Sequence, residues 1–240
     1  MKLSIILIGR NDTYGGDFVG RLNRSLESLA PLRSAEVEII LVEWNPLMNH
    51  PPLSWVIEYG AIRIITVSAA IHNSLPGAEL FPVFEYRAKN VGIRRARGDW
   101  ILCLNSDIIL TEQMRERLSE QFDHNCVYRA MRHDMDGDRL VQICDGPGDF
   151  VLMKATRWHQ LRGYLDLVSY THIDSLLFWN ADQAGLNAVV LPIPIIHQEH
   201  DRSEHKARTG IHSSDMPKFI GMKNDEGWGL ADLQLPEVTT

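Results

Sequence analysis

Short apolar segments alternate with helical segments along the first 122 residues of the chain. Residues 3–8, 37–42, 62–67 and 100–104 are apolar runs typical of strands that are buried on both faces. Residues 18–29, 84–97 and 111–122 show helical spacing or helix-end signals between those runs. This alternation predicts βαβ units, and therefore a largely parallel sheet with helices on both of its faces.

The second half of the chain predicts a smaller, mixed region. Residues 127–131 and 140–143 flank a Met-Asp-Gly-Asp turn, which is a hairpin signal. Residues 150–153 read as a strand, and helices are expected over 154–161 and 172–184. Residues 188–196 form an apolar segment that two prolines interrupt, which is typical of an edge strand.

Composition narrows the classes of protein that this chain can be. A chain of 240 residues that is 45% hydrophobic can bury one substantial core, and its net charge of −7 makes non-specific nucleic-acid binding unlikely. Its three cysteines show no CxxC spacing, so we expect a reducing compartment and no structural zinc. No apolar run approaches the roughly 20 residues of a membrane span, so we predict a cytoplasmic protein.

Polar residues follow three of the predicted strands. Ligands of parallel sheets bind at the carboxyl ends of the strands. The residues expected at those ends are Arg10 and Asp12, Glu43 and Asn45, and Asn105 and Asp107. Three polar strand exits in one half of the chain therefore predict a binding site at that edge of the sheet.

Asp107 stands between two apolar segments, where a buried carboxylate must be solvated, paired or bound to a metal. Residues 87–97 just upstream carry five cations, most of which we expect on a solvated helix face. A carboxylate beside a basic helix suits a diphosphate held through a divalent cation. The alternative is that Asp107 closes a turn or caps the helix that begins near Thr111.

Two further motifs could take part in such a site. Asp174 lies in the first turn of a predicted helix, where the helix dipole stabilises any acid, so this position alone does not indicate catalysis. His197 and His200 follow an apolar strand and could complete a metal site. Because they are three residues apart on an extended segment, we expect only one of them to bind; a solvated surface pair is the alternative.

Taken together, these residues resemble the family-2 glycosyltransferases with a GT-A fold. The resemblance covers roughly residues 1–200. It lies in residues 3–11, in Arg-Ala-Lys-Asn-Val-Gly and Arg-Gly-Asp-Trp-Ile-Leu before Asn105-Ser106-Asp107, in Gly-Asp-Phe-Val-Leu-Met at 148–153, and in Arg-Gly-Tyr-Leu-Asp at 162–166. It implies a Rossmann-like, mostly parallel central sheet flanked by helices, with a smaller mixed region on the acceptor side.

The resemblance also implies a division of the chain. A GT-A domain would span residues 1–200, with a nucleotide-binding half at 1–110 and an acceptor half at 111–200. Residues 201–240 have no counterpart in the family and are expected to form a tail that could close over the donor as a lid.

The implied activity is an inverting, hexosyltransferase-like transfer of a sugar from a UDP- or GDP-sugar to a hydroxyl of a glycan or another acceptor. Asp174 falls on the family's catalytic base, and Asp107 with His197 falls on its Mn²⁺ or Mg²⁺ ligands. Asp149 and His172 fall on the acceptor side. The expected nucleotide-sugar contacts are Ile8, Arg10, Glu43, Arg87, Lys89, Asn105 and Ser106. We expect no nucleic-acid partner and allow for peripheral association with a membrane.

Two positions depart from the family pattern. Asn105 replaces the first acid of the DXD motif, and the usual Glu-Asp pair keeps only its second acid in His172-Ile173-Asp174. A catalytically inactive module that binds a glycan or a partner is therefore one alternative. A nucleotidyltransferase acting on a sugar phosphate is another. Such an enzyme usually has a glycine-rich loop with a basic residue directly after the first strand, and Gly9-Arg10 matches that pattern only weakly.

Overall fold

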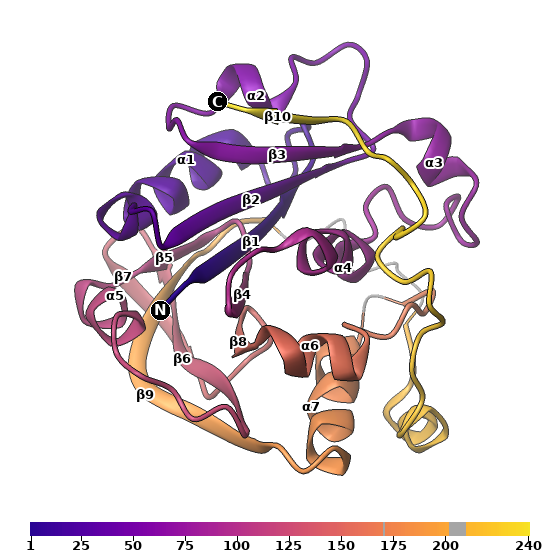
Figure 1. Cartoon of the computed structure of the whole chain (residues 1–240). Helices are drawn as coiled ribbons and strands as arrows, with labels where there is room; N and C mark the ends of the chain where they lie inside the picture. The colour runs from indigo at the N-terminus through magenta and orange to yellow at the C-terminus, as the bar shows by residue number, and fades with distance from the viewer. Residues whose placement is uncertain (170, 202–209) are drawn as a thin grey trace.

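The computed structural model describes residues 1–169, 171–201 and 210–240, and its described strands form one 10-stranded sheet. Four strands make the parallel half: β1 (Leu3–Gly9), β2 (Val37–Trp44), β3 (Ile62–Val67) and β4 (Trp100–Leu104). They lie in the order β3-β2-β1-β4 (Figure 1). The predicted βαβ alternation is confirmed, and the carboxyl ends of β1 and β4 meet at one edge.

The other half of the sheet is mixed. It contains β5 (Ile108–Leu110), β6 (Cys126–Asp136), β7 (Arg139–Cys144), β8 (Phe150–Lys154) and β9 (Asn187–Gln198). β8 joins the two halves because it pairs antiparallel with both β4 and β6. β7 pairs with β6 as the predicted hairpin.

The expectation of an edge strand over residues 188–196 is wrong, because β9 lies between β6 and β5. The prolines are accommodated by an irregularity in the pairing: Ala130 pairs with Leu191, whereas Met131 pairs with Pro194. β5 pairs only with residues 195–197, beyond both prolines. A proline in an interior strand is tolerated where no ladder hydrogen bond depends on its missing N–H.

Helices cover both faces of the sheet. α1 (Phe18–Leu29) and α5 (Glu112–Leu118) pack on one face, and α4 (Glu85–Arg95), α6 (Ala155–Leu161) and α7 (Ile173–Gln183) pack on the other. Successive residues of β1 serve the two cores in turn: Ile5 and Leu7 face α1, whereas Ile6 faces α4. The short elements are η1 (Ala30–Leu32), α2 (Leu53–Val56) and α3 (Ala69–Asn73).

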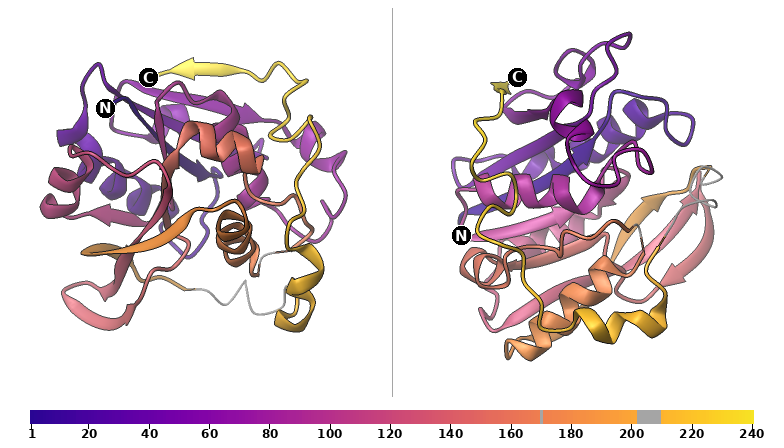
Figure 2. Two further views of the ribbon diagram at one scale, coloured as in Figure 1. Left: turned by 60° about the horizontal axis from the view of Figure 1, so that its bottom comes forward. Right: turned by 90° about the vertical axis from the view of Figure 1, so that its right-hand side faces the viewer.

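The described part of the C-terminal tail packs along the α4 side of the molecule (Figure 2). It contains η3 (Ser213–Phe219) and β10 (Glu237–Thr239), which pairs antiparallel with β3. Arg95 of α4 donates hydrogen bonds to the carbonyls of Gly229, Leu230 and Leu233. Residues 210–240 thus extend the packed domain; residues 202–209 lie outside the described part, and a lid role for the tail stays a prediction.

This packing overturns the expectation that the α4 cations form a solvated face. Lys89 is fully buried, Arg94 lies over the ring of Trp228, and Arg95 is hydrogen-bonded to the tail. Sequence periodicity alone does not anticipate this, because the segment that covers α4 comes more than a hundred residues later.

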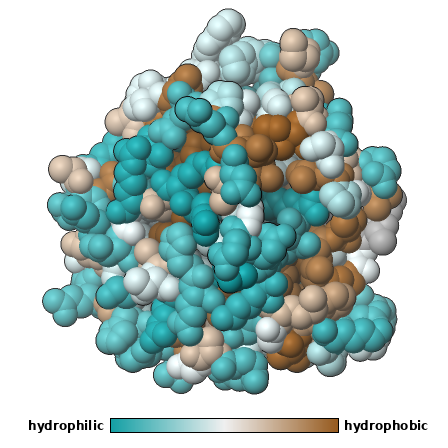
Figure 3. Space-filling view, turned by 45° about the vertical axis from the view of Figure 1, so that its right-hand side comes forward, coloured by the Kyte–Doolittle hydropathy of each residue, from teal (hydrophilic) through white to brown (hydrophobic). Residues whose placement is uncertain are grey.

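The surface of the molecule is mixed in polarity. In the face shown in Figure 3, hydrophilic side chains occupy the centre and apolar side chains gather towards the upper and right-hand margins. Among the described helices, none combines the length and the apolar character that crossing a membrane requires.

The buried pair Trp44 and His72 predicts acid sensitivity. The indole of Trp44 donates a 2.9 Å hydrogen bond to Nδ1 of His72, which must be unprotonated there. Burial lowers the pKa of His72, so the unfolded chain binds a proton at a higher pH than the folded chain. The stabilisation is therefore complete above the unfolded pKa of about 6.5 and is lost as the pH falls through the lowered folded value.

We expect wild-type protein to lose more thermal stability between pH 7.5 and pH 5.5 than a His72→Gln variant, whose amide oxygen can still accept from Trp44 but does not titrate. Loss of one buried hydrogen bond is worth about 1 kcal/mol, or roughly 2–4 °C in melting temperature for a domain of this size. Parallel pH profiles for the two proteins in a thermal melt would contradict this assignment.

Candidate functional site

A cleft of about 440 Å³ opens where β1, β4 and β9 end. Its walls come from the loop after β1, from α1, from the start of α4, from the β4–β5 turn and from the end of β9. The residues that carry polar or charged groups into it are Asp12, Tyr14, Arg21, Glu85, Asn105, Ser106, Asp107, Arg132, Asp149, Thr171, His197 and His200. This is the carboxyl edge of the sheet at which the sequence predicts a site.

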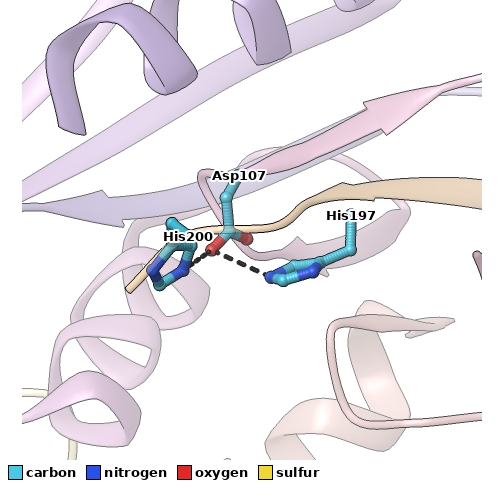
Figure 4. A group of neighbouring side chains, drawn as sticks. All are labelled: Asp107, His197 and His200. Carbon is cyan, nitrogen blue, oxygen red and sulfur yellow. Dashed lines mark hydrogen bonds and ion pairs between the residues drawn. The ribbon is translucent and has the colours of Figure 1, made fainter. Parts of the chain in front are cut away.

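Asp107 is the centre of the cleft's most concentrated group of ligand atoms (Figure 4). Its Oδ2 lies 3.1 Å from Nε2 of His200 and 3.5 Å from Nε2 of His197. Asp107 sits in the β4–β5 turn, whereas both histidines come from the end of β9, which the pairing of Ile108 with His197 brings alongside. The predicted association of Asp107 with His197 is therefore present in the structure.

The expectation that the two histidines point to different faces is wrong, because both rings lie at Asp107; that only one of them binds a metal stays a prediction. The expectation of different faces assumed that the strand continues through residue 200, so that the two side chains would alternate between faces. β9 instead ends at Gln198, so residues 199 and 200 lie outside the regular strand and the strict alternation of side chains does not extend to His200. His200 therefore lies at Asp107 beside His197.

The outer nitrogens of both imidazoles are engaged with oxygen atoms that can only accept. Nδ1 of His200 lies 3.0 Å from the carbonyl of Asp201, and Nδ1 of His197 lies 3.3 Å from Oδ1 of Asp134. With a cation bound at Nε2, each Nδ1 would carry the ring proton and point it towards its oxygen; without a cation, Nε2 can donate to Asp107 instead. Carbonyl and carboxylate oxygens at this position orient metal-binding histidines in proteins.

These three side chains fit a divalent cation. Ligands held at about 2.1 Å from one ion stand roughly 3.0–3.4 Å apart when they subtend angles of about 90–109°. The separation of 3.1 Å from His200 lies within that range, and the separation of 3.5 Å from His197 lies just above it. In addition, Oδ1 of Asp107 is buried and has no hydrogen bond to any residue of the described part, which leaves it available to a ligand.

Charge also favours the ionised form of Asp107. Burial alone would raise the pKa of this carboxyl, but hydrogen bonds and charge from His197 and His200 outweigh it and lower the pKa well below its usual range. Arg21, which is 4% exposed, adds a positive charge on the α1 side of the cleft.

The loop after β1 forms a wall around His200. Arg21 donates to the carbonyls of Tyr14 and Gly15, and the ring of Tyr14 meets His200 edge-on with 5.2 Å between centroids. A Cβ on Gly15 would lie 2.5 Å from Nδ1 of His200, so only glycine fits this approach. Sequence reasoning did not single out Arg21 or Tyr14, because Arg21 stands among polar residues of α1 and nothing in the sequence shows that it is buried.

Three of the predicted nucleotide-sugar residues line the cleft: Ile8, Asn105 and Ser106. The hydroxyl of Ser106 donates to the carbonyl of Ile8 and thereby ties the exits of β1 and β4 together. Asn105 contacts Asp149, one of the two acceptor-side predictions, through a 2.7 Å hydrogen bond from its Nδ2.

The other four nucleotide-sugar predictions do not line this cleft. Arg10 donates to the carbonyl of Asn45, and Arg87 pairs with Asp166 over the ring of Phe84. Glu43 is 2% exposed and accepts from the N–H of Leu53; burial raises its pKa, which that hydrogen bond partly offsets. Lys89 lies below the cleft floor, bonded to Asn105. A nucleotide-binding role for these four residues stays a prediction.

Asp174 and His172 lie beside the cleft rather than in its lining. Asp174 is in the first turn of α7 and packs against Gly148, where a Cβ would lie 2.5 Å from Oδ2 of Asp174. His172 is the N-terminal cap residue of α7 and has a left-handed backbone with φ of 65°. Its neighbour Thr171 lines the cleft. The structure therefore places Asp174 next to the residue that precedes Asp149.

Comparison of the sequence with protein-family models and with curated proteins gives no match. Comparison of the structure with solved structures does. A mannosyltransferase from Pyrobaculum calidifontis, solved with GDP-Man and Mn²⁺, matches 85% of this chain with a TM-score of 0.60 and 11% identity. TarS from S. aureus matches 83% of the chain with a TM-score of 0.58 and 14% identity, and its fragment 1–349 matches 82% with 0.57 and 13%.

The chain spans 59% of the mannosyltransferase chain, 37% of the TarS chain and 60% of the TarS fragment. At these identities the likeness concerns the fold. It agrees with the parallel βαβ half, the mixed second half and the helices on both faces that the sequence resemblance implies. The chain has a GT-A-like glycosyltransferase fold.

Proposed function

We propose that this protein transfers a sugar from a nucleoside-diphosphate sugar to an acceptor hydroxyl, with inversion at the anomeric carbon and with help from Mn²⁺ or Mg²⁺. The observation that carries the proposal is the convergence of Asp107, His197 and His200 in a cleft at the carboxyl edge of the sheet. The GT-A-like fold supports it, as does the GDP-Man and Mn²⁺ bound by a structural neighbour of similar fold.

Asp107, His197 and His200 would hold the cation. When bound, a divalent ion offsets the negative charge that gathers on a departing diphosphate. Arg21 lines the same cleft and would add a fixed positive charge near the phosphates. Ile8 and Ser106 would contact the nucleotide sugar at the joined exits of β1 and β4.

In the transfer step, the acceptor oxygen forms a bond to the anomeric carbon while the bond from that carbon to the diphosphate oxygen breaks. The hydroxyl proton passes to a carboxylate, and the nucleoside diphosphate leaves with its negative charge. We assign the proton to Asp174, because the resemblance places the catalytic base there and because Asp174 lies in the first turn of α7 against Gly148, beside the cleft-lining Asp149. Asp149 is less suited to this role, because its two oxygens already accept hydrogen bonds from Asn105 and Arg132. Each oxygen keeps a further lone pair, which can accept a hydrogen bond from a sugar hydroxyl.

The direct test of the function is a thermal-shift screen with UDP- and GDP-sugars, each with and without Mn²⁺. A donor at a hundredfold excess over its Kd should raise the melting temperature by roughly 5–10 °C. We expect this shift to need Mn²⁺ and to fall by at least half in a His200→Gln variant. His124→Gln is the matched control, because that ring is exposed. A full panel without any Mn²⁺-dependent shift would refute the proposed donor class.

A second prediction concerns Asp174 as the catalytic base. Asp174→Asn should lower kcat by about 10²–10⁴-fold, the range of general base catalysis, while the donor-induced thermal shift remains. Asp182→Asn on the exposed side of the same helix serves as the control and should leave kcat unchanged. Wild-type turnover by Asp174→Asn, measured as released nucleoside diphosphate, would show that another group removes the proton.

A further inference from the structure

Asn105 stands where the resemblance expects an acid, and both ends of its amide are occupied. Its Oδ1 accepts a 2.7 Å hydrogen bond from Nζ of Lys89, and its Nδ2 donates a 2.7 Å hydrogen bond to Oδ1 of Asp149. Its backbone N–H also donates to the carbonyl of Asp149, at 3.0 Å. Lys89 is 1% exposed and is neutralised by Glu85 at 2.6 Å.

The other oxygen of Asp149 extends this contact across the cleft floor. Its Oδ2 pairs with Arg132, whose Nε lies 2.7 Å from Oδ1 of Asp134. Asp134 is fully buried and faces Nδ1 of His197. Anions and cations therefore alternate from Glu85 on α4 to Asp134 on β6, and the amide of Asn105 is the one uncharged link among the described residues between them.

The orientation and the identity of residue 105 follow from its neighbours. A flipped amide would place its NH₂ group against the ammonium of Lys89 and its oxygen against the carboxylate of Asp149, so both contacts would be lost. An aspartate would satisfy Lys89 but would face Asp149 with a like charge at hydrogen-bonding distance. A side chain that accepts on one side and donates on the other meets both demands.

We propose that Asn105 is a positioning residue that aims the Asp149 carboxylate into the cleft, and that it is not a cation ligand. Asp107, His197 and His200 hold the cation without it. Asp149, fixed by Asn105 and Arg132, keeps its remaining lone pairs for ligand hydroxyls. The bound cation and the identification of those hydroxyls with a sugar rest on the proposed function, whereas the contacts of Asn105 with Lys89 and Asp149 do not. It follows that restoring the family's acid at position 105 damages this protein.

The test is a double-mutant cycle with Asn105→Asp, Asp149→Asn and the exchange of both. Asn105→Asp should lower the melting temperature by roughly 5 °C through like-charge contact, and Asp149→Asn should also lower it by setting an amide NH₂ against Arg132 or Asn105. In the exchange variant, the carboxylate now at position 105 can accept from Lys89 and from the amide now at position 149, whose oxygen can accept from Arg132. We therefore expect the exchange to recover at least half of the summed loss.

Manganese affinity of the same four proteins separates positioning from ligation. We expect the Kd for Mn²⁺, measured by titration calorimetry without donor, to stay within about threefold in Asn105→Asp. Asn49→Asp, on an exposed loop residue, controls for the added charge. A tenfold tighter Kd in Asn105→Asp alone, or additive losses of melting temperature in the exchange variant, would overturn the proposal. Neither readout needs sugar transfer, so a failure here is distinct from a failure of the proposed function.

Discussion

Two imidazole rings meet one carboxylate at the place where β9 runs alongside the β4–β5 turn. A positive charge shared among these three groups, from a cation or a protonated ring, stabilises them together, and the surrounding structure holds them there. Asp134 and the carbonyl of Asp201 engage the outer nitrogens of the rings, and Arg21 fixes the loop that walls His200. The pairing of β5 with β9 brings the two histidines to the cleft beside Asp107.

The parallel half of the fold could be predicted because its strands are buried on both faces, and such strands have continuous apolar runs in the sequence. β5 could not, since three residues are too few to show a period. The place of β9 was missed because its prolines indicate an edge, whereas a pairing irregularity accommodates them inside the sheet. The cover over α4 depends on contacts between distant segments, which periodicity does not record.

The candidate site was predictable to the extent that it follows from strand exits. Asp107, Asn105 and Ser106 lie in the cleft because they end β4, and His197 does because it lies near the end of β9. The positions of Glu43 and Lys89 could not be predicted. The N–H of Leu53, in the segment that follows β2, bonds to Glu43, and the packing of α4 buries Lys89. The role of Asn105 depends on Asp149, which is 44 positions further along the chain.

In the proposed site, one divalent cation is bound by Asp107, His197 and His200. Anomalous scattering from a crystal of the protein soaked in Mn²⁺ would locate that ion. We expect a single strong peak at about 2.0–2.3 Å from an oxygen of Asp107 and from Nε2 of both histidines. A peak at another group of residues, or full Mn²⁺ occupancy with either imidazole turned away, would refute this set of ligands.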